Sequence, residues 1–142
     1  MNEFPNLEMR NARPADWELA HRYGERVHIL DNVYLLSALA RIGSPGVAHR
    51  DLMALLRSVY QTLLMTACGR ELPRVSTSVP SRMAATHGAR GNYDGAVFDP
   101  KVKVVVVDVI RAGIVPSQVC FELLTAVLSE QCVRLDHVTM AR

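Results

Sequence analysis

Apolar residues recur along the chain with two different spacings, and these spacings predict its helices and strands. From residue 27 onward the later apolar positions fit a helix that ends near Gly43. Ser44-Pro45 then predicts the start of a second helix, with serine as the cap and proline in the first turn. Apolar residues at steps of three and four predict that this helix is amphipathic and ends near Gly69: Val47, Leu52, Leu55, Leu56, Val59, Tyr60, Leu63 and Leu64.

Two stretches lack the helical pattern. Residues 1–26 are polar and mixed, so we expect an N-terminal arm with one short helix around Pro14 to Tyr23. Residues 70–101 are rich in proline and glycine and contain short β-like patches at 75–79 and 95–98. This composition predicts a β-arm within one domain, not a linker between two domains.

The C-terminal third predicts a β–turn–α–β unit over residues 102–140. The run at 102–110 is almost continuously β-branched, which is typical of a strand buried on both faces in a parallel sheet. Arg111-Ala112-Gly113 follows as a polar turn, and Pro116-Ser117 predicts the start of a helix. Residues 133–140 read as the next strand, reached by a right-handed crossover. The predicted fold class is therefore α/β.

Composition limits the kind of protein this is. The 142 residues suffice for one domain, and the hydrophobic fraction of 49% allows a core. A net charge of +2 is compatible with a small anionic substrate but not with the dense basic patches of nucleic-acid binders. The apolar runs are too short to span a membrane. Three scattered cysteines with no signal peptide indicate a reducing cytoplasm, where they serve as small buried hydrophobes: Cys68, Cys120 and Cys132.

Two arginines follow the two predicted strands of the C-terminal unit. Ligands collect at the carboxyl ends of parallel strands, so Arg111 and Arg142 would converge on one crevice if their strands are adjacent. The guanidinium fork suits phosphate, Gly113 would let the backbone approach an anion, and the helix opening near Ser117 would supply free N–H groups. The alternative is that Arg111 is a solvated loop residue and Ala112-Gly113 only a tight turn.

Other chemistry has weaker support in the sequence. Glycine-rich phosphate loops and the serine nucleophile elbow are absent. Asp108 interrupts the apolar strand, and its carboxylate must lie at an edge, point into the site or pair with a nearby arginine or lysine; pairing is favoured because unpaired burial is costly. Five histidines show no ligand spacing and are expected to be surface or capping residues: His21, His28, His49, His87 and His137.

Residues 105–113, Val-Val-Val-Asp-Val-Ile-Arg-Ala-Gly, resemble a strand and loop of the uracil phosphoribosyltransferases, in which a hydrophobic strand leads into Ile-Leu-Arg-Ala-Gly. Residues 138–142, Val-Thr-Met-Ala-Arg, resemble the family's next strand, which ends in Gly-Met-Tyr-Arg. Val27-His28-Ile29-Leu30 is similar to the family's opening His-Pro-Leu. The resemblance covers roughly residues 27–142, and the Arg-Ala-Gly stretch is its specific part.

The resemblance implies the N-terminal part of a type I phosphoribosyltransferase-like α/β fold. It implies an enzyme of pyrimidine salvage that transfers phosphoribosyl from phosphoribosyl pyrophosphate (PRPP) to uracil or another pyrimidine base, with Mg²⁺ bound to PRPP. Arg111, Ala112, Gly113 and Arg142 would bind the pyrophosphate, and none of them would be an acid–base catalyst. A cytoplasmic oligomer, with no nucleic-acid or membrane partner, is expected.

The sequence departs from the family at several points. Asp108 replaces a proline, Val115-Pro116 replaces Gly-Met, and Ala141 replaces an aromatic residue. The family's phosphoribosyl-binding loop and uracil-binding segment are absent. We therefore expect residues 1–142 to form one incomplete domain with an open sheet edge and uncovered apolar surface, inactive until a continuation or a partner chain supplies the other half.

Two other functions remain open. The chain fits a non-catalytic regulatory or structural subunit of phosphoribosyltransferase-like fold, since the changes at Asp108 and Ala141 suit loss of catalysis. It also fits an unrelated small α/β ligand-binding module in which Arg-Ala-Gly is a chance turn.

Overall fold

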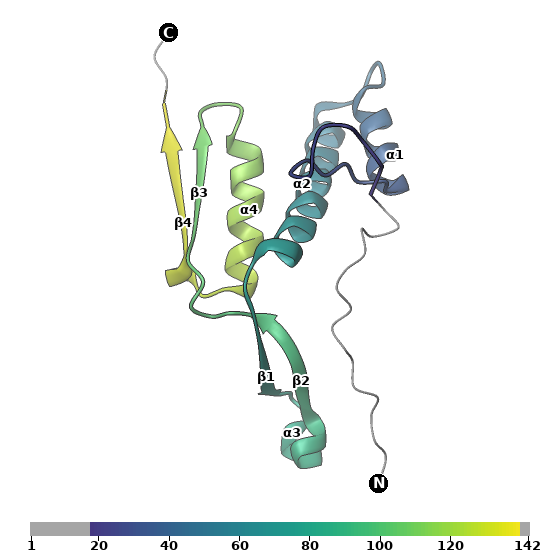
Figure 1. Ribbon diagram of the computed structural model, residues 1–142. Coiled ribbons are helices and arrows are strands. Elements are labelled where there is room, and N and C mark those ends of the chain that lie inside the picture. The colour runs from purple at the N-terminus through teal and green to yellow at the C-terminus, as the bar shows by residue number, and fades with distance from the viewer. Residues whose placement is uncertain (1–17, 140–142) are drawn as a thin grey trace. The chain divides into compact units, whose positions relative to one another are not determined.

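The computed structural model describes residues 18–139 and confirms a mixed α/β chain (Figure 1). The chain divides between Leu52 and Met53 into two units, and the division falls within helix α2. The elements are α1 (Val33–Ile42), α2 (His49–Glu71), β1 (Arg74–Pro80), α3 (Ala84–His87), a 3₁₀ turn (Gly88–Gly91), β2 (Asn92–Phe98), β3 (Val104–Val109), α4 (Ile114–Val127), a 3₁₀ turn (Glu130–Cys132) and β4 (Val133–Val138).

The N-terminal unit begins with a β-bridge between Glu18 and Leu30. The bridge is supported by the Leu19 N–H, which donates to the Ile29 carbonyl at 2.8 Å. The short helix predicted over residues 14–23 is therefore wrong in its second half, because residues 18–23 form the bridge and turns instead. Its first half lies outside the described residues.

Helix α1 is bounded by a capping asparagine at its start and by a glycine after its end. The Asn32 side chain accepts hydrogen bonds from the backbone N–H groups of Tyr34 at 2.9 Å and Leu35 at 3.2 Å, which satisfies two donors of the first turn. The helix ends at Ile42, directly before Gly43, as predicted.

Helix α2 begins at His49, four residues later than the predicted start at Pro45. Gly46 has a φ of 78°, a left-handed conformation that a right-handed helix cannot include. The helix then continues to Glu71, two residues past Gly69, because a helical glycine weakens a helix without stopping it.

Strands β1 and β2 form an antiparallel hairpin, with Arg74 opposite Phe98 and Pro80 opposite Asn92. Figure 1 shows α3 at the tip of this hairpin. The hairpin occupies the interval for which proline, glycine and short β-like patches predict a β-arm. Its β-branched residues explain the extended backbone, and the glycines near the tip explain the reversal.

The C-terminal segment is a β–α–β unit, with β3 and β4 adjacent and parallel from Val104 opposite Val133 to Val109 opposite Val138. Helix α4 packs along one side of this pair (Figure 1). The core between them is built on Leu124, Leu128 and Val133, all at most 7% exposed. The two strands are therefore adjacent, which is the condition under which Arg111 and Arg142 would converge on one crevice.

Strand β3 is buried on one face only, which corrects the expectation that both faces are covered. Val104 and Val106 face the core with Asp108, whereas Val105 and Val107 are each 58% exposed and Val109 is 48% exposed. Within residues 53–139 the sheet has only β3 and β4, and no second layer lies over the outer face. The expected uncovered apolar surface is present.

Helix α4 starts at Ile114, two residues before the predicted Pro116. Proline lacks a backbone N–H, and the N–H groups of the first helical turn need no helical partner, so Pro116 fits inside this turn. Across the described residues, none of the helices has both the length and the apolar character that crossing a bilayer requires.

Candidate functional site

The loop Arg111-Ala112-Gly113 lies at the carboxyl end of the parallel pair. The Ile110 N–H donates to the Val138 carbonyl at 3.0 Å, so the loop follows directly on the last ladder bond between β3 and β4. The peptide bond between Ile110 and Arg111 is cis. Arg111 and Ala112 are exposed, and Arg111 makes no ion pair with any residue among 18–139. Arg142 lies outside the described residues, so its convergence with Arg111 stays a prediction.

Gly113 is required by close packing, not by an unusual backbone angle. A Cβ at this position would lie 2.6 Å from the Cβ of Asp108 and 3.0 Å from the backbone nitrogen of Val109. The Gly113 N–H donates to the Val109 carbonyl at 3.0 Å, which folds the loop back on the end of β3. The backbone of Gly113 thus approaches the strand, whereas the sequence predicted that it approaches a ligand.

Few backbone N–H groups remain free at the start of α4. Ser117 donates to Gly113 at 3.0 Å and Ile114 donates to Arg111 at 3.3 Å, while Pro116 has no N–H. The prediction of a free donor is therefore wrong for the Ser117 N–H, because the helix starts earlier and the Gly113 carbonyl accepts this N–H.

Asp108, Ser117 and His137 form a polar cluster on the inner face of the sheet. The Asp108 side chain is only 2% exposed, and its Oδ1 lies 2.9 Å from Nδ1 of His137. The Ser117 hydroxyl donates to Oδ2 of the same carboxylate and also to the Ile114 carbonyl at 3.0 Å. Asp108 is therefore paired, as the cost of unpaired burial predicted, but with histidine and serine instead of arginine or lysine.

These contacts set the charge state of Asp108. The hydrogen bond from Ser117, and then that from His137, hold the pKa of the Asp108 carboxyl below its usual value, which outweighs the upward effect of burial. The carboxylate is therefore charged at neutral pH. It ties β3 to both α4 and β4 at the edge where the Arg111 loop begins.

His137 is the functional candidate that sequence reasoning missed. Its Nδ1 is held by Asp108, its side chain is 46% exposed, and its Nε2 forms no hydrogen bond with the described residues. No spacing rule could find it, since Asp108 and His137 are 29 positions apart and meet only through strand register. A parallel alignment of the two strands places them opposite each other only in the observed register, which sets Val104 opposite Val133.

The cluster cannot work as a serine hydrolase triad. In such a triad the histidine lies between serine and aspartate, so that it can take the proton of the hydroxyl. Here the carboxylate of Asp108 lies between Ser117 and His137, and both donate to it. The arrangement orients the His137 ring and braces the loop, but it does not activate Ser117.

A cavity of about 780 Å³ lies elsewhere in the C-terminal unit. It is lined by the base of the hairpin and the end of α4, including Val75, Phe98, Val127 and Leu128. Its lining contains neither Arg111 nor His137, and its walls are mostly apolar. The concave surface and the polar cluster are therefore separate features.

The cysteines were expected to be small buried hydrophobes, and the structure shows all three of them only partly buried. Burial raises the pKa of Cys68, with a smaller contribution from Cys120, and burial also raises the pKa of Cys120. Cys132 has no disulfide partner among residues 18–139. A raised thiol pKa lowers the thiolate fraction, so Cys68 and Cys120 are poor nucleophiles at neutral pH.

Comparison with known proteins does not assign the chain to a family. No family model matches the sequence, and no curated protein matches it significantly.

Proposed function

We propose that the chain is the N-terminal portion of a uracil phosphoribosyltransferase-like protein and that it binds the pyrophosphate end of PRPP at the Arg111 loop. The observation that carries the proposal is the exposed Arg111, which makes no ion pair with any described residue and follows a strand adjacent and parallel to the next one. Such strand ends are where α/β sheets bind ligands. The other half of the site, which grips the ribose phosphate and reads the base, would come from a continuation of the polypeptide or from a partner chain.

In this proposal Arg111 acts electrostatically. Negative charge builds on the pyrophosphate as it leaves the ribose carbon, and a fixed guanidinium lowers the barrier by stabilising that charge. Arg142 would supply a second guanidinium. The Asp108–Ser117–His137 cluster would act as a positioning device, since it fixes β3, β4 and α4 around the first residue of the loop.

Mg²⁺ belongs to this proposal as a ligand of PRPP, where it neutralises the pyrophosphate. Among residues 18–139 no three histidine, cysteine or acidic side chains gather to hold a metal. We therefore assign no step of the reaction to a metal held by these residues.

The proposal predicts that the 142-residue chain binds pyrophosphate with Mg²⁺. At about 100 times its dissociation constant, a ligand of the native state raises the free energy of unfolding by about 2.7 kcal/mol. Pyrophosphate and PRPP should therefore raise the melting temperature, whereas ribose 5-phosphate should not, because the ribose-phosphate loop is missing. Thermal denaturation with each ligand measures this.

Arg111→Ala should weaken pyrophosphate binding by about tenfold or more, since a hydrogen bond to a charged group is lost. Arg90→Ala, which removes the same charge at the tip of the hairpin, is the matched control and should keep the full temperature rise. A rise that persists in the Arg111 variant contradicts the site assignment.

A non-catalytic subunit of phosphoribosyltransferase-like fold is the second candidate, and one observation favours it. Asp108 lies at the position of the family's proline. Its carboxylate accepts hydrogen bonds from Ser117 and His137, so it stabilises the fold and is not available for catalysis. The DNA downstream of the Arg142 codon separates the two functions. An Asp-x-x-x-Ala-Thr-Gly-x-Ser segment there supports the enzyme, and its absence from that and neighbouring frames supports the subunit.

A further inference from the structure

Strand β4 has one edge that pairs with no strand among residues 18–139. Within residues 18–139 it pairs only with β3. Val138 points its carbonyl at β3, because that carbonyl accepts from the Ile110 N–H. Backbone groups alternate in direction along a strand, so Arg134 and Asp136 also point theirs at β3. Val133, Leu135 and His137 therefore direct their N–H and C=O groups to the free edge.

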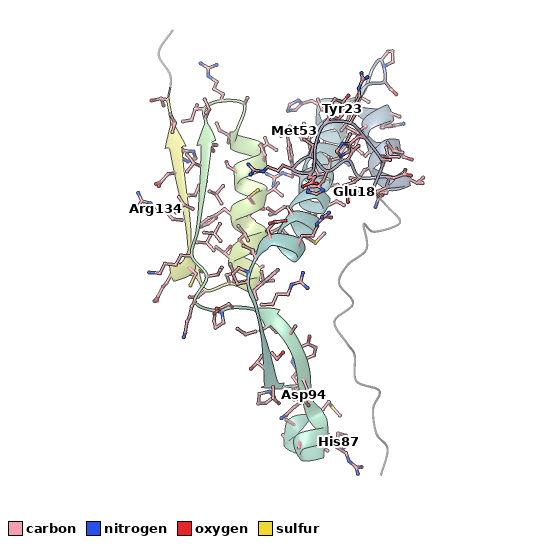
Figure 2. All side chains as sticks on the ribbon, viewed as in Figure 1. Glu18, Tyr23, Met53, His87, Asp94 and Arg134 are labelled. Carbon is pink, nitrogen blue, oxygen red and sulfur yellow. The ribbon has the colours of Figure 1, made fainter. Side chains whose placement is uncertain are left out.

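The side chains of Arg134 and Asp136 lie on the sheet face away from α4. They are 74% and 39% exposed, and Arg134 Nε lies 2.8 Å from Oδ2 of Asp136. Figure 2 shows Arg134 projecting from β4 on the side away from α4. The free edge thus carries a positive and a negative side chain two residues apart, with Leu135 midway between them.

We propose that β4 pairs antiparallel with β4 of a second copy of this chain, about a two-fold axis at Leu135. This register places Arg134 of each copy opposite Asp136 of the other. It also places Val133 opposite His137, and Leu135 opposite its own counterpart. The occupant of the edge is a second copy because the pattern Arg-x-Asp is complementary to itself when one strand is reversed.

The backbone supports the same register independently of the charges. In an antiparallel pair, hydrogen-bonded and non-hydrogen-bonded residue pairs alternate. The three residues with free backbone groups, Val133, Leu135 and His137, all fall in hydrogen-bonded pairs. The charged residues fall in the non-hydrogen-bonded pairs, where side chains come closest. A parallel pairing in register would instead place Arg134 against Arg134.

Pairing of two copies through β4 would stabilise the two-stranded sheet of the isolated chain. A two-stranded sheet is marginal in water, and an unpaired edge is open to uncontrolled pairing. Joining two copies through β4 makes a four-stranded sheet in the order β3-β4-β4-β3. This inference does not rest on the proposed function, because the dimer leaves Arg111 and the outer edge of β3 free.

Sedimentation equilibrium of the full chain over a range of concentrations tests the proposal. The unmodified chain should show a reversible monomer–dimer equilibrium. Arg134→Glu and Asp136→Arg each place like charges opposite each other twice, so each variant should weaken dimerisation by about tenfold or more. Arg90→Glu makes the same charge change at the hairpin tip and should leave the equilibrium unaltered.

A mixture of the two single variants shows whether the charges act between two chains or through the Arg134–Asp136 ion pair within one chain. In the mixture, Glu at 134 and Asp136 of one copy both face arginines of the other, so a heterodimer should form as tightly as the unmodified dimer. The ion pair within each chain remains broken. If a reversal variant fails to fold by circular dichroism, Arg134→Gln and Asp136→Asn should still weaken the dimer several-fold. A monomer at every concentration, or a dimer that ignores these charges, overturns the proposal.

Discussion

At the scale of single residues, the carboxylate of Asp108 is the most consequential group in the C-terminal unit. It is buried inside a run of valines, and its two partners come from the helix and the strand that follow it in the chain. Burying a carboxylate is costly unless hydrogen bonds compensate, and here Ser117 and His137 supply them. The residue that interrupts the apolar pattern is thus the one that joins three elements.

Asp108→Asn should destabilise the chain in a pH-dependent way. The pKa of Asp108 in the folded state lies below its usual value, mainly through the hydrogen bond from Ser117 and then that from His137. Its stabilising effect is therefore complete above the unfolded pKa and is lost as the pH falls through the folded pKa. Urea denaturation of both proteins should show a large difference at about pH 7 that shrinks below about pH 4. Asp94→Asn, on exposed β2, should show no such trend.

Gly113→Ala should cost about 1–3 kcal/mol, because the added methyl would lie 2.6 Å from the Asp108 side chain and the loop must shift. Gly69→Ala is the matched control. A Cβ at Gly69 in helix α2 would have no other atom within 4 Å, so this change should stabilise the chain by about 0.5–1 kcal/mol. Chemical denaturation of both variants gives the comparison, and equal effects would contradict the packing described for Gly113.

At the scale of elements, α4 packs on the sheet through Leu124 and through Leu128, which directly follows the helix. Leu124 and Leu128 lie four residues apart on the face toward β3 and β4 and are 4% and 7% exposed. Val127, next to Leu128, is 63% exposed. The sequence predicted a helix here from Pro116-Ser117, but which face of the helix is buried depends on the single sheet face that it covers.

Leu124→Ala should lower the free energy of unfolding by about 2–5 kcal/mol, as expected for truncation in a packed core. Val127→Ala, on the same helix and largely exposed, should change it by less than about 0.5 kcal/mol. Urea denaturation with both variants measures the contrast. Similar losses for the two would mean that α4 does not pack on the sheet through the Leu124 face.

At the scale of the whole molecule, the sequence predicted the order and type of most described elements. Each of these elements is determined by a local sequence signal. The signals are the valine run of β3, the three- and four-residue spacing of apolar positions in α2, and the glycine and proline residues of the hairpin. Helix starts were less predictable. Ser44-Pro45 has the composition of a helix start, yet the left-handed backbone of Gly46 prevents a helix from beginning there. Pro116 lies within the first turn of α4 and not at its first residue.

The candidate site was predictable only in part. The position of Arg111 follows from strand order alone, because a loop after a parallel strand must lie at the carboxyl edge. The partners of Asp108 required register, which brings residues 29 positions apart together and which no spacing along one element encodes. The one-sided burial of β3 depends on how many layers cover the sheet, and apolar residues on both faces cannot reveal this.

The exposed valines of β3 have a consequence for how the protein behaves in concentrated solution. Val104 to Val107 form an uncharged, β-branched stretch, and alternate members stand open to water. An exposed β-branched surface of this kind favours association between chains. Val107→Lys should therefore raise the protein concentration at which the purified chain begins to precipitate.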